Sequence, residues 1–256
     1  MQVGLKVWSQ NLNYQKPAYD LWQKGVYDYI ELYICPNATE EQAISWQDLN
    51  VPYILHAPHS YSGFNLAIPQ NSDKTQRLLE VEVFNRILSP EFIIFHPGLN
   101  GTLQETINQI NIFKNIFKNI FKKALIENKP AIGLQGEKCL GASPEEIAII
   151  KEKTGLGFCL DFGHAICASY TQNIFYQDYI LAFLKLNPEM FHLSDGDEFS
   201  AKDQHLNYGK GNFNLKWLVD CVGNKKVSLE TDKQSKFNLA DFYQDVRYLK
   251  QYEFNC

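Results

Sequence analysis

The sequence has no closely spaced cysteine pair, because its six cysteines are scattered over 256 residues: Cys35, Cys139, Cys159, Cys167, Cys221 and Cys256. Structural zinc sites and redox-active dithiols depend on such pairs, so neither is indicated. A chain of this length also buries a core large enough to fold without disulfides. We therefore expect reduced thiols that pack as small hydrophobic side chains.

Basic runs and long apolar segments are missing as well. The chain has 24 Lys and Arg against 29 Asp and Glu, a net charge of −5, so a nucleic-acid partner would need a local basic patch. No apolar stretch is long enough to span a bilayer. The N-terminal residues MQVGLKVWSQNL lack the basic and then apolar pattern of a secretion signal. We expect a cytoplasmic protein with no membrane partner.

Short apolar runs recur along the chain and alternate with segments that carry helix-start signals, such as Thr39-Glu40-Glu41 and Ser143-Pro144. The dinucleotide-binding glycine motif of an open, doubly wound sheet is missing after the first run. We therefore predict an α/β fold in which residues 1–256 form a single (β/α)8 TIM barrel of parallel strands with outer helices. The predicted strands are Val3–Trp8, Tyr27–Ile34, Tyr53–His56, Phe92–His96, Ala131–Gln135, Leu156–Asp161, Met190–Leu193 and Val227–Glu230.

One segment repeats every four residues: residues 111–123 read NIFKNIFKNIFKK. The repeat predicts one long outer helix that packs on the barrel. It places Ile112, Ile116 and Ile120 on one stripe beside the phenylalanines and leaves the lysines in solvent.

Histidines and acids gather at the C-terminal ends of the predicted strands. Each of the six histidines lies at, or in the loop after, a strand end, and Asp161 and Glu230 close two strands. The C-terminal rim of such a barrel carries the active site, so residues far apart in sequence should converge on one pocket: His56, His96, Asp161, His192 and Glu230. Histidine with carboxylate and without cysteine is the ligand set for zinc, manganese or iron held for chemistry. The surplus of ligands indicates a cluster of two or three ions.

Six segments, taken in order, resemble the metal motifs of the endonuclease IV family (AP endonuclease family 2), within the xylose-isomerase-like barrel superfamily. The resemblance extends from the predicted third strand to the eighth. The segments are His56-Ala57-Pro58 with Asn65-Leu66-Ala67, Phe95-His96-Pro97-Gly98, Cys159-Leu160-Asp161-Phe162-Gly163-His164-Ala165, Phe191-His192-Leu193-Ser194-Asp195, Asp203-Gln204-His205 with Gly209-Lys210-Gly211, and Leu229-Glu230-Thr231.

The resemblance implies three zinc sites at the rim. The implied ligands are His56 and His96 for the first ion, Asp161, His192 and Glu230 for the second, and His164, Asp203 and His205 for the third.

The family also has a glutamate that ends the fifth strand and bridges the first two ions. The predicted fifth strand, Ala131–Gln135, places Gln135 at this position, and a neutral amide is a poor bridge between two cations. Glu137 has the same strand parity two residues further along, so Gln135 and Glu137 are both candidates for the bridging position and for metal binding. Together with Asp161 and Glu230, Glu137 is then a candidate catalytic acid.

The rim loops give a mixed indication about DNA. Family members insert loop side chains into the minor groove, whereas the loop at residues 35–41 is acidic and has no Arg or Lys. The loop after His56 carries Tyr61 and Phe64, which fit wedges in DNA or lid aromatics over a small ligand. Abasic-site DNA and a small phosphorylated or sugar substrate both remain open.

Three functions follow from these residues. The first is a phosphodiester hydrolase resembling endonuclease IV, which would cleave apurinic/apyrimidinic sites by a metal-activated hydroxide. The second is a sugar or sugar-phosphate isomerase or epimerase of the same superfamily, which would use one divalent metal ion. The third is a barrel without catalysis that binds a metabolite. A count of two or three ions favours the hydrolase, and one ion favours the isomerase.

Overall fold

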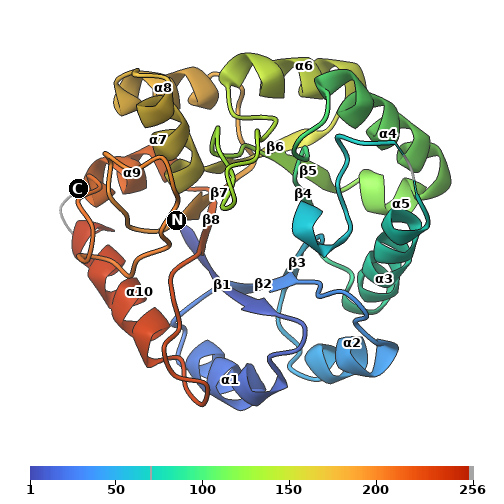
Figure 1. The fold of residues 1–256 in the computed structure, drawn as a ribbon. Coiled ribbons are helices and arrows are strands. Elements are labelled where there is room, and N and C mark those ends of the chain that lie inside the picture. The colour runs from blue at the N-terminus through green and yellow to red at the C-terminus, as the bar shows by residue number, and fades with distance from the viewer. Residues whose placement is uncertain (70, 254–256) are drawn as a thin grey trace.

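The computed structural model of the protein describes residues 1–69 and 71–253. Eight parallel strands close into a barrel in chain order, and β8 returns to pair with β1 through Gln2 and Lys226. Figure 1 shows the strands at the centre and the helices around them. The predicted α/β barrel is confirmed. The strands are β1 (Gln2–Trp8), β2 (Tyr29–Tyr33), β3 (Tyr53–His56), β4 (Ile93–Phe95), β5 (Ala124–Glu127), β6 (Gly157–Asp161), β7 (Met190–Leu193) and β8 (Lys226–Leu229).

The helices begin where their capping residues predict. The Thr39 side chain accepts a hydrogen bond from the backbone N–H of Gln42 in a capping box at the start of α2. Ser143 caps α6, which has Pro144 in its first turn. No helix in residues 1–69 and 71–253 combines the length and apolar character needed to cross a membrane. The helices are α1 (Gln15–Gln23), α2 (Glu40–Gln47), α3 (Ser72–Leu88), α4 (Leu103–Ile116), α5 (Lys118–Phe121), α6 (Pro144–Thr154), α7 (Phe162–Thr171), α8 (Tyr176–Leu184), α9 (Leu215–Val222) and α10 (Ala240–Glu253).

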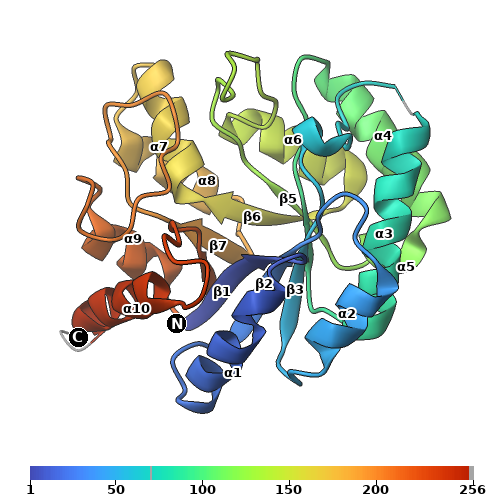
Figure 2. The same ribbon diagram turned by 60° about the horizontal axis from the view of Figure 1, so that its bottom comes forward.

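The predicted fifth strand is wrong. The strand at this position is β5, Ala124–Glu127, and residues 131–135 lie in the loop between β5 and α6. Gly133 N donates to Glu137 O and Gly136, with φ of 90°, donates to Gly133 O, so the segment folds into a tight turn. Glycines in such positions end a strand. Figure 2 shows this loop, in yellow-green, projecting beyond the strands.

The predicted long helix over residues 111–123 is also wrong. The helix α4 ends at Ile116, Phe117 leaves the helical conformation, and α5 follows. A four-residue repeat advances by about 40° around an α-helix at each step, so one side chain of each repeat cannot stay on the buried face. Accordingly, Ile116 is 60% exposed whereas Ile120 is fully buried.

Alternate strand residues form two layers inside the barrel. The first layer is an apolar floor of Tyr29, Ile54, Ile94, Leu125, Cys159 and Met190. Gly4 makes room for this floor on β1, because a Cβ atom there would lie 2.4 Å from the Tyr29 ring. Two residues further along the same strands lies a buried polar layer: Glu31, His56, His96, Glu127, Asp161 and His192. The floor therefore presents the polar layer at the C-terminal ends of the strands.

Candidate metal centre

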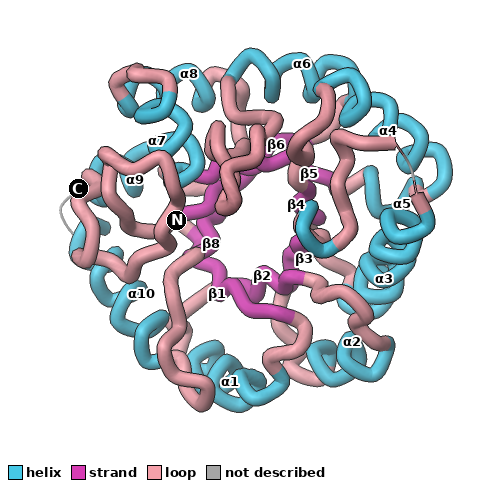
Figure 3. The backbone as a smooth tube through the Cα atoms, in the orientation of Figure 1, coloured by secondary structure: helices cyan, strands magenta, loops and turns pink. Residues whose placement is uncertain are grey.

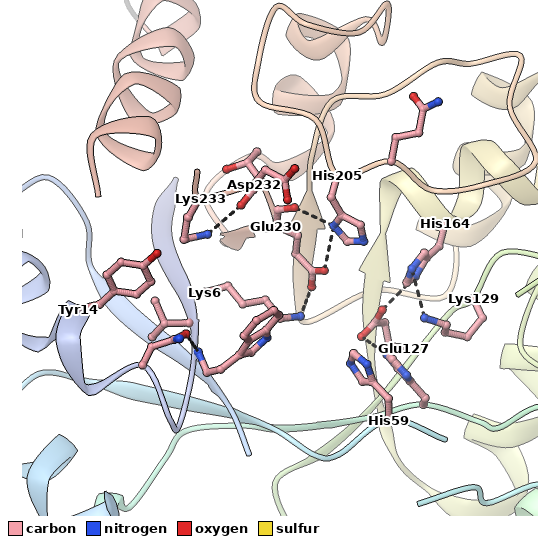
Figure 4. A pocket seen from close by; sticks show the side chains of 16 residues that line it. Lys6, Tyr14, His59, Glu127, Lys129, His164, His205, Glu230, Asp232 and Lys233 are labelled. Atoms are coloured by element: carbon pink, nitrogen blue, oxygen red, sulfur yellow. Dashed lines mark hydrogen bonds and ion pairs between the residues drawn. The ribbon is translucent and has the colours of Figure 1, made fainter. Parts of the chain in front are cut away.

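A cavity of about 430 Å³ lies above the polar layer. Loops surround the barrel at the C-terminal ends of the strands (Figure 3). Figure 4 shows Glu127, His59 and His164 on one side of Lys6 and Glu230, with Tyr14 on the other side. We use the name metal centre for the histidines and acids at this cavity: His56, His59, His96, Glu127, Asp161, His164, His192, Asp203, His205 and Glu230.

Glu127, the last residue of β5, lies at the middle of the metal centre. Its Oε2 atom is 3.0 Å from His56 Nε2 and 3.1 Å from His96 Nε2. Its Oε1 atom is 3.0 Å from His164 Nδ1. The separations from His56 and His96 are those of ligands that share a metal ion, whereas Oε1 accepts from the His164 ring. His56 Nδ1 is 2.8 Å from the carbonyl of Ala57, so it carries the proton and Nε2 is free to ligate.

His192 connects Glu127 to the second group of ligands. Its Nδ1 atom is 2.6 Å from Glu230 Oε1, 3.5 Å from Glu127 Oε2 and 3.7 Å from Asp161 Oδ2. On the other side of the ring, Nε2 is 2.9 Å from Glu31 Oε2. A carboxylate there accepts from Nε2 and orients the ring, so that Nδ1 faces the acids where a metal ion would bind.

The third group combines α7 with the long loop after β7. Asp203 Oδ2 lies 3.4 Å from His164 Nε2 and 3.0 Å from His205 Nε2. His205 Nδ1 is 2.7 Å from the carbonyl oxygen of Glu230, and His164 Nδ1 is 2.9 Å from that of Asn128. Both rings therefore turn Nε2 toward Asp203, which gives three donors for one ion.

Asp195 holds the loop that carries Asp203 and His205. Its carboxylate accepts four backbone N–H groups: Oδ1 from Gly196 and Phe213, and Oδ2 from Gly209 and Gly211. Its backbone also forms an antiparallel bridge with Leu206. Asp195 is itself buried. The loop therefore presents its two ligands from a fixed backbone.

Two lysines place positive charge within the metal centre. Lys6 Nζ bonds Glu230 and lies 3.1 Å from Glu31 Oε1. Lys129 Nζ is 3.2 Å from His164 Nε2. Although burial opposes its charge, the pKa of Lys6 is raised well above its usual value by Glu230 and Glu31. Lys6 is therefore an ammonium that neutralises part of the acidic group.

Although burial opposes the charge, neighbouring carboxylates raise the pKa of His192 well above its usual value and that of His205 to about 10, so a metal ion would have to displace these protons. Burial would raise the pKa of Glu127, yet the histidine rings around it lower it well below its usual range, in part through hydrogen bonds from His164 and His192. Burial, together with neighbouring cations, lowers the pKa of His59 and of His96, so both rings are neutral and able to ligate. Burial raises the pKa of Cys159 to about 12, so this thiol is no ligand.

The donor set fits divalent metal ions. His192 Nδ1 and Asp203 Oδ2 are buried and make no hydrogen bond within the described residues, although each faces other ligand atoms. A bound cation would satisfy both atoms. Five carboxylates in or next to the metal centre outnumber the two ammonium groups of Lys6 and Lys129. The five are Glu31, Glu127, Asp161, Asp203 and Glu230.

Three of the predicted site residues lie outside the metal centre, namely Gln135, Glu137 and Phe64, whereas Tyr61 lies at the rim. Gln135 is exposed in the β5–α6 loop, and Glu137 accepts hydrogen bonds from the Tyr61 hydroxyl, at 2.6 Å, and from Gln135 N. The predicted bridging by Gln135 or Glu137 is corrected because β5 ends at Glu127. Tyr61 is 50% exposed at the rim, whereas Phe64 is buried against Phe95 and is a core residue. The remaining predicted ligands meet in the metal centre.

The prediction missed Glu127, His59, Glu31 and Lys6. The signal for Glu127 is the short run Ala124-Leu125-Ile126, which follows two lysines and precedes an acid. The signal for Glu31 is its place on β2 two residues beyond Tyr29, because alternate side chains of a strand point to the same side, here into the barrel.

A family model described as xylose isomerase-like TIM barrel matches residues 27–252, and the chain belongs to this family. Two curated relatives are named probable endonuclease 4. The one from Thermosipho melanesiensis is 30% identical over 192 residues, 66% of this chain and 65% of its own. The one from Thermoplasma volcanium is 27% identical over 173 residues, 62% of this chain and 59% of its own. The match therefore spans less than two thirds of either relative.

Solved structures share the fold over nearly the whole chain. Endonuclease IV from Thermus thermophilus has a TM-score of 0.70 at 18% identity, with 100% of both chains covered. A D-psicose 3-epimerase has a TM-score of 0.61 at 12% identity, covering 99% of this chain and 98% of its own. At these identities the likeness concerns the barrel alone.

Proposed function

We propose that the protein is a metal-dependent phosphodiester hydrolase of the endonuclease IV type. The position of Glu127 carries the proposal, because its Oε2 atom lies within 3.1 Å of His56 and His96 and 3.5 Å from His192 Nδ1 in the second group. A carboxylate shared in this way suits a cluster of two or three ions better than a single ion. When bound, zinc ions, or manganese or iron, would lower the pKa of a water molecule and neutralise the phosphate oxygens.

Two lysines at the cavity are the candidates for binding the substrate phosphate. Lys129 lies beside His164, and Lys233 lines the cavity near Tyr14 (Figure 4). Burial lowers the pKa of Lys233 to about 8, and its Nζ donates to the carbonyl of Thr231 at 2.9 Å. Both ammonium groups would attract phosphate oxygens.

The shape of the cavity points to a compact unit of substrate. Trp8 and Tyr14 supply aromatic wall next to Lys6 and Lys233, and such rings pack on the apolar face of a sugar. A space of about 430 Å³ suits one sugar phosphate rather than the flat surface of a duplex. We therefore propose that a DNA substrate enters with its abasic nucleotide turned out of the helix.

Cleavage of a duplex with one abasic site tests the proposal, with the intact duplex as control. We expect two or three ions per chain by elemental analysis and cleavage of the abasic duplex alone. Chelation by EDTA and Glu127→Gln should both abolish it, whereas Gln135→Ala should leave it unchanged. If the metal-loaded wild type leaves the abasic duplex intact, DNA is rejected as the substrate.

A sugar isomerase or epimerase is the second candidate, and one observation favours it. Glu127 ends β5 and Glu230 follows β8, so two acids flank the cavity with Asp161 and His192 between them. One divalent ion with two such acids serves proton transfer next to a carbonyl group. One ion per chain, together with conversion of a ketose such as D-fructose, would favour this class over the hydrolase.

A further inference from the structure

We propose that His59 is a third histidine ligand of the first metal ion, beside His56, His96 and Glu127. The inference rests on the proposed metal centre and adds a residue to it. His59 follows His56 by three residues, in the loop after β3. One ring nitrogen from each of the three histidines lies within 4.8 Å of the other two. Donor atoms bound to one zinc ion at about 2.0–2.1 Å lie at most about 4.2 Å apart, so a small rotation of the rings brings all three into reach.

The surroundings of His59 fix its ring without using its nitrogens. The backbone N of His59 donates to the Tyr33 hydroxyl at 3.1 Å. The ring stacks on that of His96, with centroids 4.6 Å apart and planes at 22°, and lies 4.5 Å from the Tyr33 ring. Within the described part of the chain, neither ring nitrogen of His59 has a hydrogen-bond partner. A half-buried imidazole held in this way is a preformed ligand.

His59 faces the cavities at the C-terminal end of the barrel. It lines both the main cavity and a neighbouring one of about 180 Å³, under the β5–α6 loop. His96, Lys129, His164 and His205 line both cavities as well, and the His59 ring lies 5.1 Å from that of His56. No acid other than Glu127 lies within ion-pairing distance of His56 or His96 among the described residues. The fourth donor of this group must therefore come from water or from His59.

The proposal has a chemical consequence for the cluster. Three histidines and one carboxylate complete a tetrahedral zinc site, which is the arrangement of a closed site rather than of an open one. The first ion would then anchor Glu127, and positions for water and substrate would remain at the other two groups. The two groups are Asp161, His192 and Glu230, and His164, Asp203 and His205.

The test compares His59→Phe with Ser60→Ala. Phenylalanine retains the ring that stacks on His96 and removes only the nitrogens, whereas Ser60 is the adjacent residue of the same loop and offers no ligand. We expect Ser60→Ala to match the wild type. We expect His59→Phe to bind one metal ion per chain at least about tenfold more weakly in a chelator competition. Its cobalt-substituted form should lose the intense visible absorption of one four-coordinate ion.

A second measurement uses the wild-type chain and does not depend on the variant folding. Diethyl pyrocarbonate, which modifies free imidazole nitrogens, is applied to the metal-loaded and to the EDTA-treated protein, and the peptide with His59 is analysed by mass spectrometry. We expect modification of His59 only after EDTA treatment. Equal modification in both forms, or unchanged metal affinity and cobalt absorption in His59→Phe, would overturn the role of His59. A wild type that binds no metal would instead overturn the metal centre itself.

Discussion

Lys129 Nζ lies 3.2 Å from His164 Nε2, the nitrogen that faces Asp203. A lysine ammonium is thus placed against the donor that a third metal ion would use. The lysine and the ion compete for this nitrogen, and each repels the other. The strength of the third metal site therefore depends on where Lys129 points.

We predict that Lys129→Met strengthens metal binding at the third group. Even at the dielectric constant of water, a unit charge about 5 Å from a dication costs about 1.7 kcal/mol, which is more than tenfold in affinity. Metal titration against a chelator measures the change, and Lys210→Met, at an exposed loop position, is the control. The same variant should raise KM for a phosphodiester if Lys129 contacts the phosphate. An unchanged metal affinity would show that the ammonium swings away freely.

We predict that Glu127→Gln removes at least one metal ion per chain. The amide keeps the size of the side chain but loses the charge that lies 3.0 Å from His56 and 3.1 Å from His96. Elemental analysis after dialysis measures the loss. Glu137→Gln is the control, since Glu137 bonds Tyr61 outside the metal centre and should retain all metal. Equal metal loss in both variants would contradict the assignment of Glu127 as the shared ligand.

We predict that Lys6→Met destabilises the metal-free protein by about 3–5 kcal/mol, since it leaves Glu31 and Glu230 buried without their cation. Bound divalent ions would replace part of the lost charge, so the loss should be smaller with metal present. Urea unfolding with and without EDTA measures both values. Lys16→Met breaks an exposed pair with Asp20 and should cost less than about 0.5 kcal/mol. An equal loss with and without metal would separate Lys6 from the metal centre.

We predict that Asp195→Asn weakens the third metal site from outside it. An amide in place of the carboxylate can accept on one side only, so about two of the four backbone hydrogen bonds to Asp195 are lost. At roughly 1–2 kcal/mol each, the free energy of unfolding should fall by about 2–4 kcal/mol. Metal affinity should fall with it because the loop carries Asp203 and His205. Asp197→Asn, nearer the surface, should have the smaller effect on both measurements.

The barrel was predictable from the sequence because its strands carry strong apolar runs between capped helices. Seven strands lie within two residues of their predicted bounds, and Tyr53–His56 and Met190–Leu193 agree to the residue. The ligands that end these strands were predictable for the same reason. The failure at β5 has a local cause. Ala124–Glu127 is shorter than the apolar run at residues 131–135, and hydrophobicity alone does not show that Gly133 and Gly136 fold that run into a turn.

His59, Glu31 and Lys6 were harder to predict because their roles depend on cross-barrel neighbours. Lys6 on β1 meets Glu230 across 224 residues of chain. Glu31 on β2 meets His192 on β7 across 161 residues. An isolated charge in a buried strand gives no indication of its partner until the closure of the barrel brings the two strands together.

The metal centre takes ligands from β3, β5, β6 and β7 and from the segments just after β4 and β8, so bound ions would join strands that are remote in the chain. Each ion would act as a cross-link that exists only while the barrel is closed. Metal release and transient opening between strands are then coupled events. The backbone amides of the strands should exchange with deuterium faster in the stripped protein than in the loaded one.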